Sequence, residues 1–563
     1  MSIQSDKKAM DFIANEKQFH LGFLPTEQSS PLTRNLDREF AKSSLDGVRN
    51  LQSVDRNVLV MAKRIFVSDQ FKRLVNDGIA TIKNGGRVVF SGCGATGRLS
   101  ILLECLWRRC CALDPKAAPY ADRVFSIMTG GDYALVRSVE FFEDYQSFGR
   151  RQVADLNLCA QDMLVAITEG GETSSVLGTV FESLERGLKV FLMFNNPAEL
   201  LVEHLERSRK AIVDPRVCVL DLCCGPMALA GSTRMQATTS EQLVAGGALE
   251  SMMNALLGNQ ATDYASQFEH LLEQLESDDA CKAIAGYIDF EADIYRRKGL
   301  LTYFSGEYLL DVFTDTTERS PTFMLPPFRK KDDAVSPRSW TFVKNPCLTT
   351  EEVWSQGMRR PLRCLEWKLE DYIALGASEN VRSNPPKIKK AELLKFEVGK
   401  ENPEDRAVTG HDAAVLVTTG NPEDASYRAA FQAMEAPFET RRELAIGGKK
   451  DADWHIPCEQ ENGPLHLMTH MAVKLVLNTI STGIMVSLGR VTGNWMSWVD
   501  VSNKKLIDRA IRLIAEIGQI NYETSAKKLF AAIEELDGKR KPSDEKVSYV
   551  QYVLDQLKIN SKA

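Results

Sequence analysis

Three loops rich in Gly, Ser and Thr carry residue types suited to holding a phosphate group. They are SGCGATGR at 91–98, TEGGETSS at 168–175 and GSTRM at 231–235. In the first, glycines would let backbone N–H groups approach an anion, Thr96 offers a hydroxyl, and a following helix adds a favourable dipole. The third adds two hydroxyls and the Arg234 guanidinium, which suits a phosphate or carboxylate. Together the loops predict a site for a phosphorylated polyol.

The first loop by itself is a weak motif. A strand-to-helix turn that binds no ligand would have the same composition, and a dinucleotide-binding turn is a second alternative. The dinucleotide reading is disfavoured because the G-x-G-x-x-G order is incomplete and no acidic residue ends an evident second strand.

Each loop must be positioned by the elements around it. Apolar strand-like runs at 87–90 and 163–167 precede the first two loops, and another run spans 190–194. Such runs alternate with longer helical patterns, which is typical of βαβ units around a mainly parallel sheet. Ligands bind at the carboxyl ends of strands in such sheets, and the loops fall there.

An internal repeat predicts two domains of this kind. DMLVAITEG at 162–170 is echoed by DAAVLVTTG at 412–420, and QLV at 242–244 by KLV at 474–476. GRVVFSG at 86–92 is echoed more weakly by GLLTYFSG at 299–306. Three echoes in one order indicate duplication of a domain. The 563 residues are also too many for one hydrophobic core.

The composition of the chain indicates which classes of ligand and partner it does not suit. The net charge of −7 argues against a broad nucleic-acid or anionic membrane surface. No signal peptide or run of about 18 apolar residues is evident, so we expect a soluble, cytoplasmic protein. The 12 cysteines are scattered through the sequence, and we expect them to be buried, reduced thiols. His466 and His470 lack the glutamate of a zinc-peptidase motif, so we expect no metal and no cofactor.

The chain resembles the family that contains the bacterial N-acetylmuramic acid 6-phosphate etherases and the glucokinase regulatory protein of animals, both built on sugar-isomerase (SIS) domains. The resemblance rests on SGCGATGRLSIL, MTGGDYALVRSVEFFED, QDMLVAITEGGETSSVLG, GSTRMQATTSEQLV, LPTEQSSPLTRNLD and the long KLVLNTISTGIMVSLGRVTGNWMSWVDVSNKKLIDRAIRLI stretch. These motifs occur in family order over most of the chain. In layout the chain is closest to the two-domain glucokinase regulatory protein, because the etherases have one SIS domain per chain.

The resemblance implies a fold and a site. The fold is α/β, with two tandem SIS-type αβα sandwich domains, mainly parallel sheets and a C-terminal helical cap. The expected segments are an N-terminal helical and extended segment at 1–50, a first SIS domain at 51–262, a bridging helix at 263–298, a second SIS domain at 299–500 and the cap at 501–563. The implied ligand-binding residues are Gly94, Thr96, Gly97, Glu143, Thr168, Gly170, Thr173, Ser232, Thr233, Arg234, Glu318 and Lys474.

Two of these carboxylates could do chemistry. The resemblance places Glu318, in TDTTERSPT, where the etherases have a catalytic glutamate, and Glu143 at the family's other acidic position. In an etherase they would act as base and acid in the elimination of lactate from C3 of the sugar. They could equally accept hydrogen bonds from sugar hydroxyls.

The sequence also departs from the family pattern. Ala95 replaces the usual Thr of the first loop, and Glu172 brings a carboxylate that would repel a phosphate into the second. The second lobe's first loop, SGEYLL at 305–310, has lost the glycines and hydroxyls, so we expect one competent pocket per chain.

Two functional hypotheses follow. The first is a sugar-phosphate-binding protein, similar to the glucokinase regulatory protein, that offers a ligand-dependent surface to a partner such as a sugar kinase. The second is a lyase acting on N-acetylmuramic acid 6-phosphate. An isomerase of ketose and aldose phosphates is a weaker alternative, because no convincing histidine and glutamate pair is evident.

Overall fold

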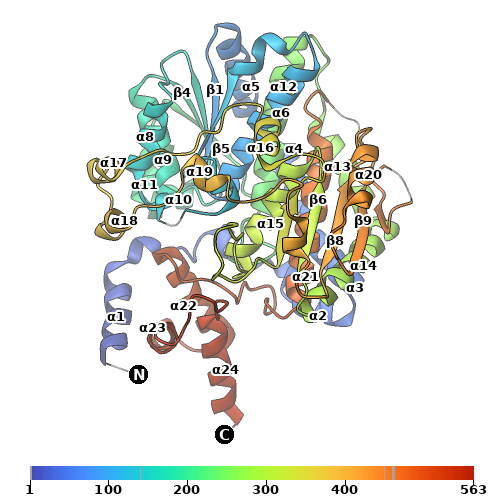
Figure 1. Cartoon of the computed structure of the whole chain (residues 1–563). Helices are drawn as coiled ribbons and strands as arrows, with labels where there is room; N and C mark the ends of the chain where they lie inside the picture. Colours follow the sequence, from blue (N-terminus) through green and yellow to red (C-terminus); the bar gives the residue numbers. More distant parts are fainter. Residues whose placement is uncertain (1–2, 140, 449–450, 460–462, 563) are drawn as a thin grey trace.

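The protein contains two parallel β-sheets flanked by helices. The structure is a computed structural model that describes residues 3–139, 141–448, 451–459 and 463–562. The first sheet consists of β1 (Val88–Gly92), β2 (Val124–Met128), β3 (Met163–Ile167), β4 (Lys189–Phe194) and β5 (Val217–Asp221). The second consists of β6 (Leu301–Ser305), β7 (Thr341–Lys344), β8 (Ala413–Thr418), β9 (Thr440–Ile446) and β10 (Trp454–Ile456). We call the parts around these sheets the first and second lobes (Figure 1).

The two sheets have the same topology. The first has strand order β2-β1-β3-β4-β5 and the second β7-β6-β8-β9-β10, and every described strand pair is parallel. The echoed sequences therefore occupy equivalent places, since β1 corresponds to β6 and β3 to β8. The α/β fold with two SIS-type sandwiches is confirmed.

Residues of one strand alternate between two faces, as the two-residue period of a strand requires. Val88 and Phe90 of β1 point into a large core that extends through both lobes, whereas Val89 points into a separate core on the outer face of the first sheet. The large core packs β1 against α5 (Asp69–Lys83) and α6 (Ala95–Leu113). The outer core packs against α9 (Ser174–Glu185).

Two long helices join the lobes. α12 (Gln236–Leu257) follows the GSTRM loop and contacts α21 (Leu467–Ser487) of the second lobe. Both are buried along most of their length, with polar as well as apolar side chains inside. α15 (Leu309–Phe323), which carries the TDTTERSPT sequence, packs against α21 and also contacts α6. One hydrophobic core thus extends through both lobes.

The segment predicted as one bridging helix is two helices. α13 (Tyr264–Leu275) ends before Ser277, and α14 (Asp278–Arg296) begins after it. The Ser277 hydroxyl accepts a hydrogen bond from the Ala280 N–H, so it caps α14, and Asp278 and Asp279 favour the helix start. The spacing of charged and apolar residues predicts helix across this segment, but it does not predict the division into two helices at Ser277.

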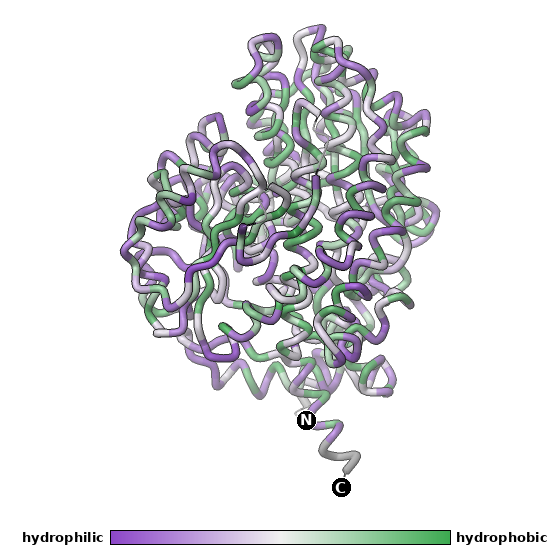
Figure 2. The backbone as a smooth tube through the Cα atoms, turned by 90° about the vertical axis from the view of Figure 1, so that its right-hand side faces the viewer, coloured by the Kyte–Doolittle hydropathy of each residue, from purple (hydrophilic) through white to green (hydrophobic). Residues whose placement is uncertain are grey.

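The C-terminal helices pack with the N-terminus below the lobes. α22 (Lys504–Gly518), α23 (Tyr522–Asp537) and α24 (Tyr549–Lys562) form the helical cap, and α1 (Ile3–Asn15) packs on α23 (Figure 1). The C-terminal end of the chain extends beyond the body of the protein (Figure 2). Among the described helices, none has the length and apolar character needed to cross a bilayer.

Candidate functional site

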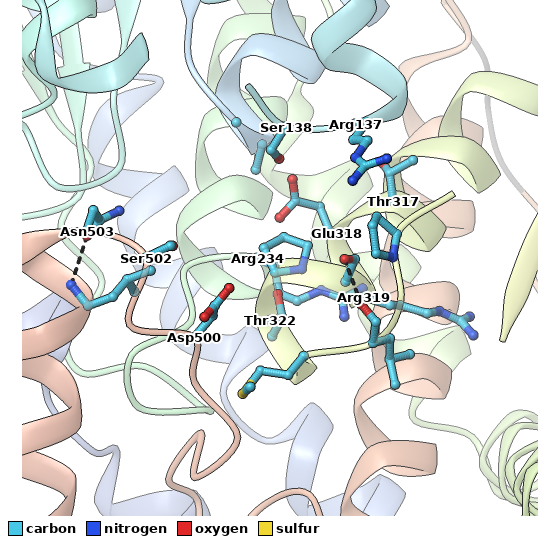
Figure 3. Close-up of a pocket in the computed structure, with 18 of the residues that line it drawn as sticks. Arg137, Ser138, Arg234, Thr317, Glu318, Arg319, Thr322, Asp500, Ser502 and Asn503 are labelled. Atoms are coloured by element: carbon cyan, nitrogen blue, oxygen red, sulfur yellow. Dashed lines mark hydrogen bonds between the residues drawn. The ribbon is translucent and has the colours of Figure 1, made fainter. Parts of the chain in front are cut away.

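A cavity of about 460 Å³ opens where the two lobes and the cap meet. The first lobe supplies the ends of β1, β2 and β3, the second lobe supplies α15, and the cap supplies the start of α22. Figure 3 shows Asp500, Ser502 and Asn503 across the cavity from Thr317, with Glu318 between them. Eight of the twelve predicted ligand-binding residues line it, namely Gly94, Glu143, Gly170, Thr173, Ser232, Thr233, Arg234 and Glu318.

The first loop exposes its backbone to the cavity, whereas its Thr96 hydroxyl does not line the cavity. Gly94 lines the cavity with φ +57°, a left-handed conformation that favours glycine. The Thr96 hydroxyl donates to the Cys93 carbonyl (2.8 Å) and accepts from the Cys93 N–H (3.0 Å), and its side chain is fully buried. A Cβ on Gly97 would lie 2.8 Å from Met128, so this glycine serves close packing on β2. Thr96 and Gly97 therefore shape the loop without lining the cavity.

Two hydroxyls of the second loop are also hydrogen-bonded within the loop. The Thr168 and Thr173 hydroxyls are hydrogen-bonded to each other (2.9 Å), and Thr168 does not line the cavity. Glu172, expected to repel a phosphate, forms ion pairs with Arg207 (2.7 Å) and Lys505 (3.5 Å). Burial raises the pKa of the Glu172 carboxyl, but Lys505 and Arg207 outweigh it and leave the pKa lowered. The charge that made the loop unsuitable is thus compensated.

Glu169 is a cavity residue that the sequence interpretation missed. It lines the cavity beside Gly170, and burial, reinforced by the charge of Glu318, raises its pKa to about 7. Its Oε1 is 3.4 Å from the Thr233 hydroxyl. A carboxyl group with a pKa near 7 can both give and take a proton at neutral pH.

Replacing Glu169 by Gln should stabilise the protein in a pH-dependent way. The native carboxyl has a pKa of about 7 in the folded chain against an ordinary 4.5, so it ionises in the folded protein only at a cost. That cost is absent below about pH 4.5, grows between pH 4.5 and 7, and is constant above. We expect E169Q to be about 2–3 kcal/mol more stable than the native chain at pH 8 and equally stable near pH 4.5.

The measurement is the free energy of unfolding of both proteins at several pH values. Glu435→Gln provides the control, because the Glu435 side chain is exposed and does not line the cavity, so its replacement should have only a small effect. A stability difference for E169Q that does not change with pH would contradict the assignment.

The third loop brings a buried arginine to the cavity. Arg234 is 3% exposed; it pairs with Asp315 of α15, and its Nη2 donates to the Ser481 hydroxyl of α21 (2.8 Å). Its Nε and Nη1 are buried without a hydrogen-bond partner among the described residues. Burial lowers its pKa, an effect that Asp315 opposes. Arg234 therefore keeps two unsatisfied donors beside the cavity, which an anionic ligand could satisfy.

Glu318 and Glu143 line the cavity from different lobes. Glu318 extends from α15 of the second lobe and pairs with Arg98 of the first, whose side chain is 1% exposed. Arg98 also donates to the Leu135 carbonyl (3.0 Å), which fixes its position. Glu143 accepts a hydrogen bond from the Asn503 amide of the cap (2.9 Å). Both carboxylates are thus present in one cavity, each held by a partner.

Lys474 does not line the cavity, although the resemblance implied a ligand-facing lysine. Its ammonium donates to the Arg234 carbonyl (3.1 Å), the Thr239 hydroxyl (2.8 Å) and the Asn478 amide oxygen (2.9 Å). Burial, reinforced by Arg234, lowers its pKa to about 7. Lys474 therefore fixes the third loop from behind.

Two other lysines line the cavity: Lys546, which is paired with Asp500, and Lys505, in the first turn of α22. Glu143, as the main cause, and Glu172 raise its pKa, so it is an ammonium at neutral pH. The Asn503 side chain caps α22 by accepting from the Leu506 N–H (2.9 Å) and thereby sets the direction of this turn. The sequence signal was an Asn before an amphipathic helix, which predicts a helix start but not its place in the fold.

The described residues contain no group of three or more His, Cys, Asp or Glu that could hold a metal ion. His470, one of the two histidines considered as ligands, is instead paired with Asp311 (2.8 Å). The candidate site consequently has cations, hydroxyls and carboxylates as its polar groups.

The chain is similar in sequence to known proteins. The glucokinase regulatory protein N-terminal SIS domain matches residues 70–183. N-acetylmuramic acid 6-phosphate etherase 1 of Bacillus licheniformis is 27% identical over 227 residues, which cover 40% of this chain and 67% of that protein. The N-acetylmuramic acid 6-phosphate etherase of Thermosynechococcus vestitus is 30% identical over 258 residues, covering 45% of this chain and 76% of that protein.

Among solved structures, tagatose-6-phosphate ketose/aldose isomerase of Escherichia coli aligns with a TM-score of 0.43 at 10% identity, covering 81% of this chain and 96% of that one. The family match at 70–183 includes the first two of the loops that line the cavity. The chain belongs to the SIS-domain family that contains the N-acetylmuramic acid 6-phosphate etherases and the glucokinase regulatory protein.

Proposed function

We propose that the protein binds a phosphorylated sugar in the cavity between the lobes and acts as a sensor of that sugar. The observation that carries the proposal is the arrangement of charge in one cavity. Arg234 and Lys505 are cationic, while Glu143 and Glu318 are acceptors facing them. Cationic donors suit a phosphate, and carboxylates suit sugar hydroxyls.

Three parts of the chain would contact the ligand together. Arg234 belongs to the first lobe, Glu318 to the second and Lys505 to the cap. A ligand that contacts all three stabilises the arrangement in which they are close, in proportion to its preference for that arrangement. The outer surface of the cap would then report occupancy of the cavity to a partner protein, for which a sugar kinase is our candidate.

The second candidate function is elimination of lactate from N-acetylmuramic acid 6-phosphate. The observation favouring it is that Glu169, with a pKa of about 7, shares the cavity with Glu143 and Glu318. One carboxylate would remove the C2 proton, and a protonated carboxyl would protonate the departing lactyl oxygen. The sensor is preferred because Arg98 already binds Glu318 and Asn503 already binds Glu143.

One experiment separates the two functions. Purified protein is incubated with N-acetylmuramic acid 6-phosphate while lactate is measured, and thermal stability is followed with a panel of hexose and amino-sugar phosphates. For the sensor we expect stabilisation by at least one sugar phosphate and no lactate. Glu318→Gln should weaken that stabilisation, because the amide cannot accept two hydrogen bonds from sugar hydroxyls while holding Arg98.

Lactate release by the native protein that is lost in Glu318→Gln and Glu143→Gln would establish the lyase and reject the sensor alone. Glu203→Gln is the control, since this exposed side chain is absent from the cavity. If no sugar phosphate stabilises the protein and no lactate appears, both candidate functions are wrong.

A further inference from the structure

The second lobe has its own smaller cavity, of about 200 Å³, at the place that corresponds to the first. It lies between α6 of the first lobe and the ends of β6 and β7. In the large cavity, α15 of the second lobe faces the loop after β1. In the small one the relation is reversed, because α6 of the first lobe faces the loop after β6. The duplicated fold thus produces two inter-lobe cavities.

The small cavity has lost the features that suit a phosphate. A Cβ on Gly306 would lie 1.9 Å from the Tyr427 ring, so that ring covers the backbone of the loop. Arg109, the cation that α6 contributes, is paired with Glu307 of the same loop. An anion would therefore find the backbone of this loop covered and Arg109 already paired, while the exposed Arg359 also lines the cavity.

Two buried polar groups in the small cavity nevertheless need partners. His470 is 3% exposed, and its Nδ1 lies 2.8 Å from the Asp311 carboxylate, while its Nε2 has no hydrogen-bond partner among the described residues. The Trp354 indole N–H, in α16 (Thr350–Met358), is likewise buried without a described partner. With Nδ1–H donated to Asp311, Nε2 of His470 is left to hydrogen-bond a ligand. The cavity therefore contains two buried polar groups that a hydroxyl-bearing ligand could satisfy.

The remainder of the wall is mixed. Its apolar residues are Leu102, Cys105, Leu106, Leu309, Leu310, Phe313, Leu348, Val353, Met358 and Val398, and its polar residues include Asn345, Gln356, Arg359 and Glu423. A volume of 200 Å³ corresponds to about seven waters at about 30 Å³ each, which is enough for a molecule of monosaccharide size. Apolar walls with a few convergent polar groups are typical of small-molecule sites.

We propose that the small cavity is a second binding site, for an uncharged polyhydroxylated molecule such as an unphosphorylated monosaccharide or polyol. A hydroxyl of the ligand donates to Nε2 of His470, and an oxygen accepts from the Trp354 indole N–H. The apolar residues of the wall pack against the C–H face of the ligand. Binding here requires no phosphate, so the site distinguishes free sugar from phosphorylated sugar within one chain.

The test uses glucose, fructose and sorbitol as probes in calorimetric titration of the full chain. Trp354→Phe removes the N–H but keeps an aromatic ring, and should weaken binding of a probe by about five- to tenfold, as expected for one hydrogen bond. His470→Gln, which keeps an acceptor, should weaken it less. Lys505→Met should leave probe binding unchanged, because Lys505 lines only the large cavity.

A crystal soaked with the tightest-binding probe should show it beside His470. Density for the probe only in the large cavity would overturn the proposal, as would equal affinity of the native and Trp354→Phe proteins. Absence of binding by all three probes at tens of millimolar would also overturn it. These outcomes are independent of the sugar-phosphate site, whose failure would appear as loss of the phosphate-dependent stabilisation.

Discussion

Replacing Lys505 by Met should raise the dissociation constant for a sugar phosphate by about ten- to a hundredfold, the loss expected for a hydrogen bond to a charged group. The Lys505 ammonium lies at the start of α22, and its side chain is 25% exposed toward the cavity. Its removal would also leave Glu143 and Glu172 with less compensation, so that two carboxylates would repel the phosphate. The affinity is measured by calorimetric titration at constant ionic strength.

The adjacent lysine provides a matched control. Lys504 is 53% exposed and pairs with Glu16 (2.6 Å), away from the residues that line the cavity. Lys504→Met removes the same charge from the same helical turn, and we expect its dissociation constant to stay within about twofold of the native value, since exposed pairs contribute little. Equal affinity of the Lys505→Met and native proteins would show that the ligand does not contact the cap.

Much of the fold could be predicted because each strand carries its own signal. The run at 163–167 is β3 with the same bounds, and the echo at 412–420 contains β8. Apolar runs that end in small polar residues are local features, so one sequence suffices to find them. The break between α13 and α14 depends on the Ser277 hydroxyl, a single capping group inside a long helical pattern.

The site was harder to predict because side-chain direction depends on contacts distant in sequence. Glycine positions in the first loop were recognisable, but the Thr96 hydroxyl turns back onto Cys93. Glu172 was interpreted as repulsive because Arg207 lies 35 residues away and Lys505 more than 300. Motif matching identifies which loops form the site; the compensation of charge within it arises only when the cap packs on the first lobe.

Lys474 and Lys505 show the same limit. Both occur in the long matching stretch that ends at Ile514, and either could be the ligand-facing lysine on sequence alone. The position of each lysine in its helix determines which of the two lines the cavity. Lys474 lies inside α21, behind the third loop, whereas Lys505 lies in the first turn of α22, which borders the cavity.

Replacing Arg319 by Met should destabilise the protein by about 3–5 kcal/mol, the usual effect of removing one partner from a buried ion pair. Arg319 is 1% exposed; its Nη1 lies 2.5 Å from Glu291 and its Nε lies 3.0 Å from Asp315. Without the guanidinium, the fully buried Glu291 carboxylate would lose its cation. Urea or guanidinium unfolding of the native and variant proteins measures the difference.

An exposed pair serves as the control for this prediction. Arg49 and Asp278 form an ion pair (2.6 Å) in which the side chains are 47% and 69% exposed, so Arg49→Met should cost less than about 1 kcal/mol. The double replacement Arg319→Met with Glu291→Gln should recover part of the loss, because no isolated carboxylate remains. If Arg319→Met costs no more than Arg49→Met, the buried pair contributes nothing to stability. Because Asp315 pairs with both Arg319 and Arg234, Arg319→Met should also weaken sugar-phosphate binding.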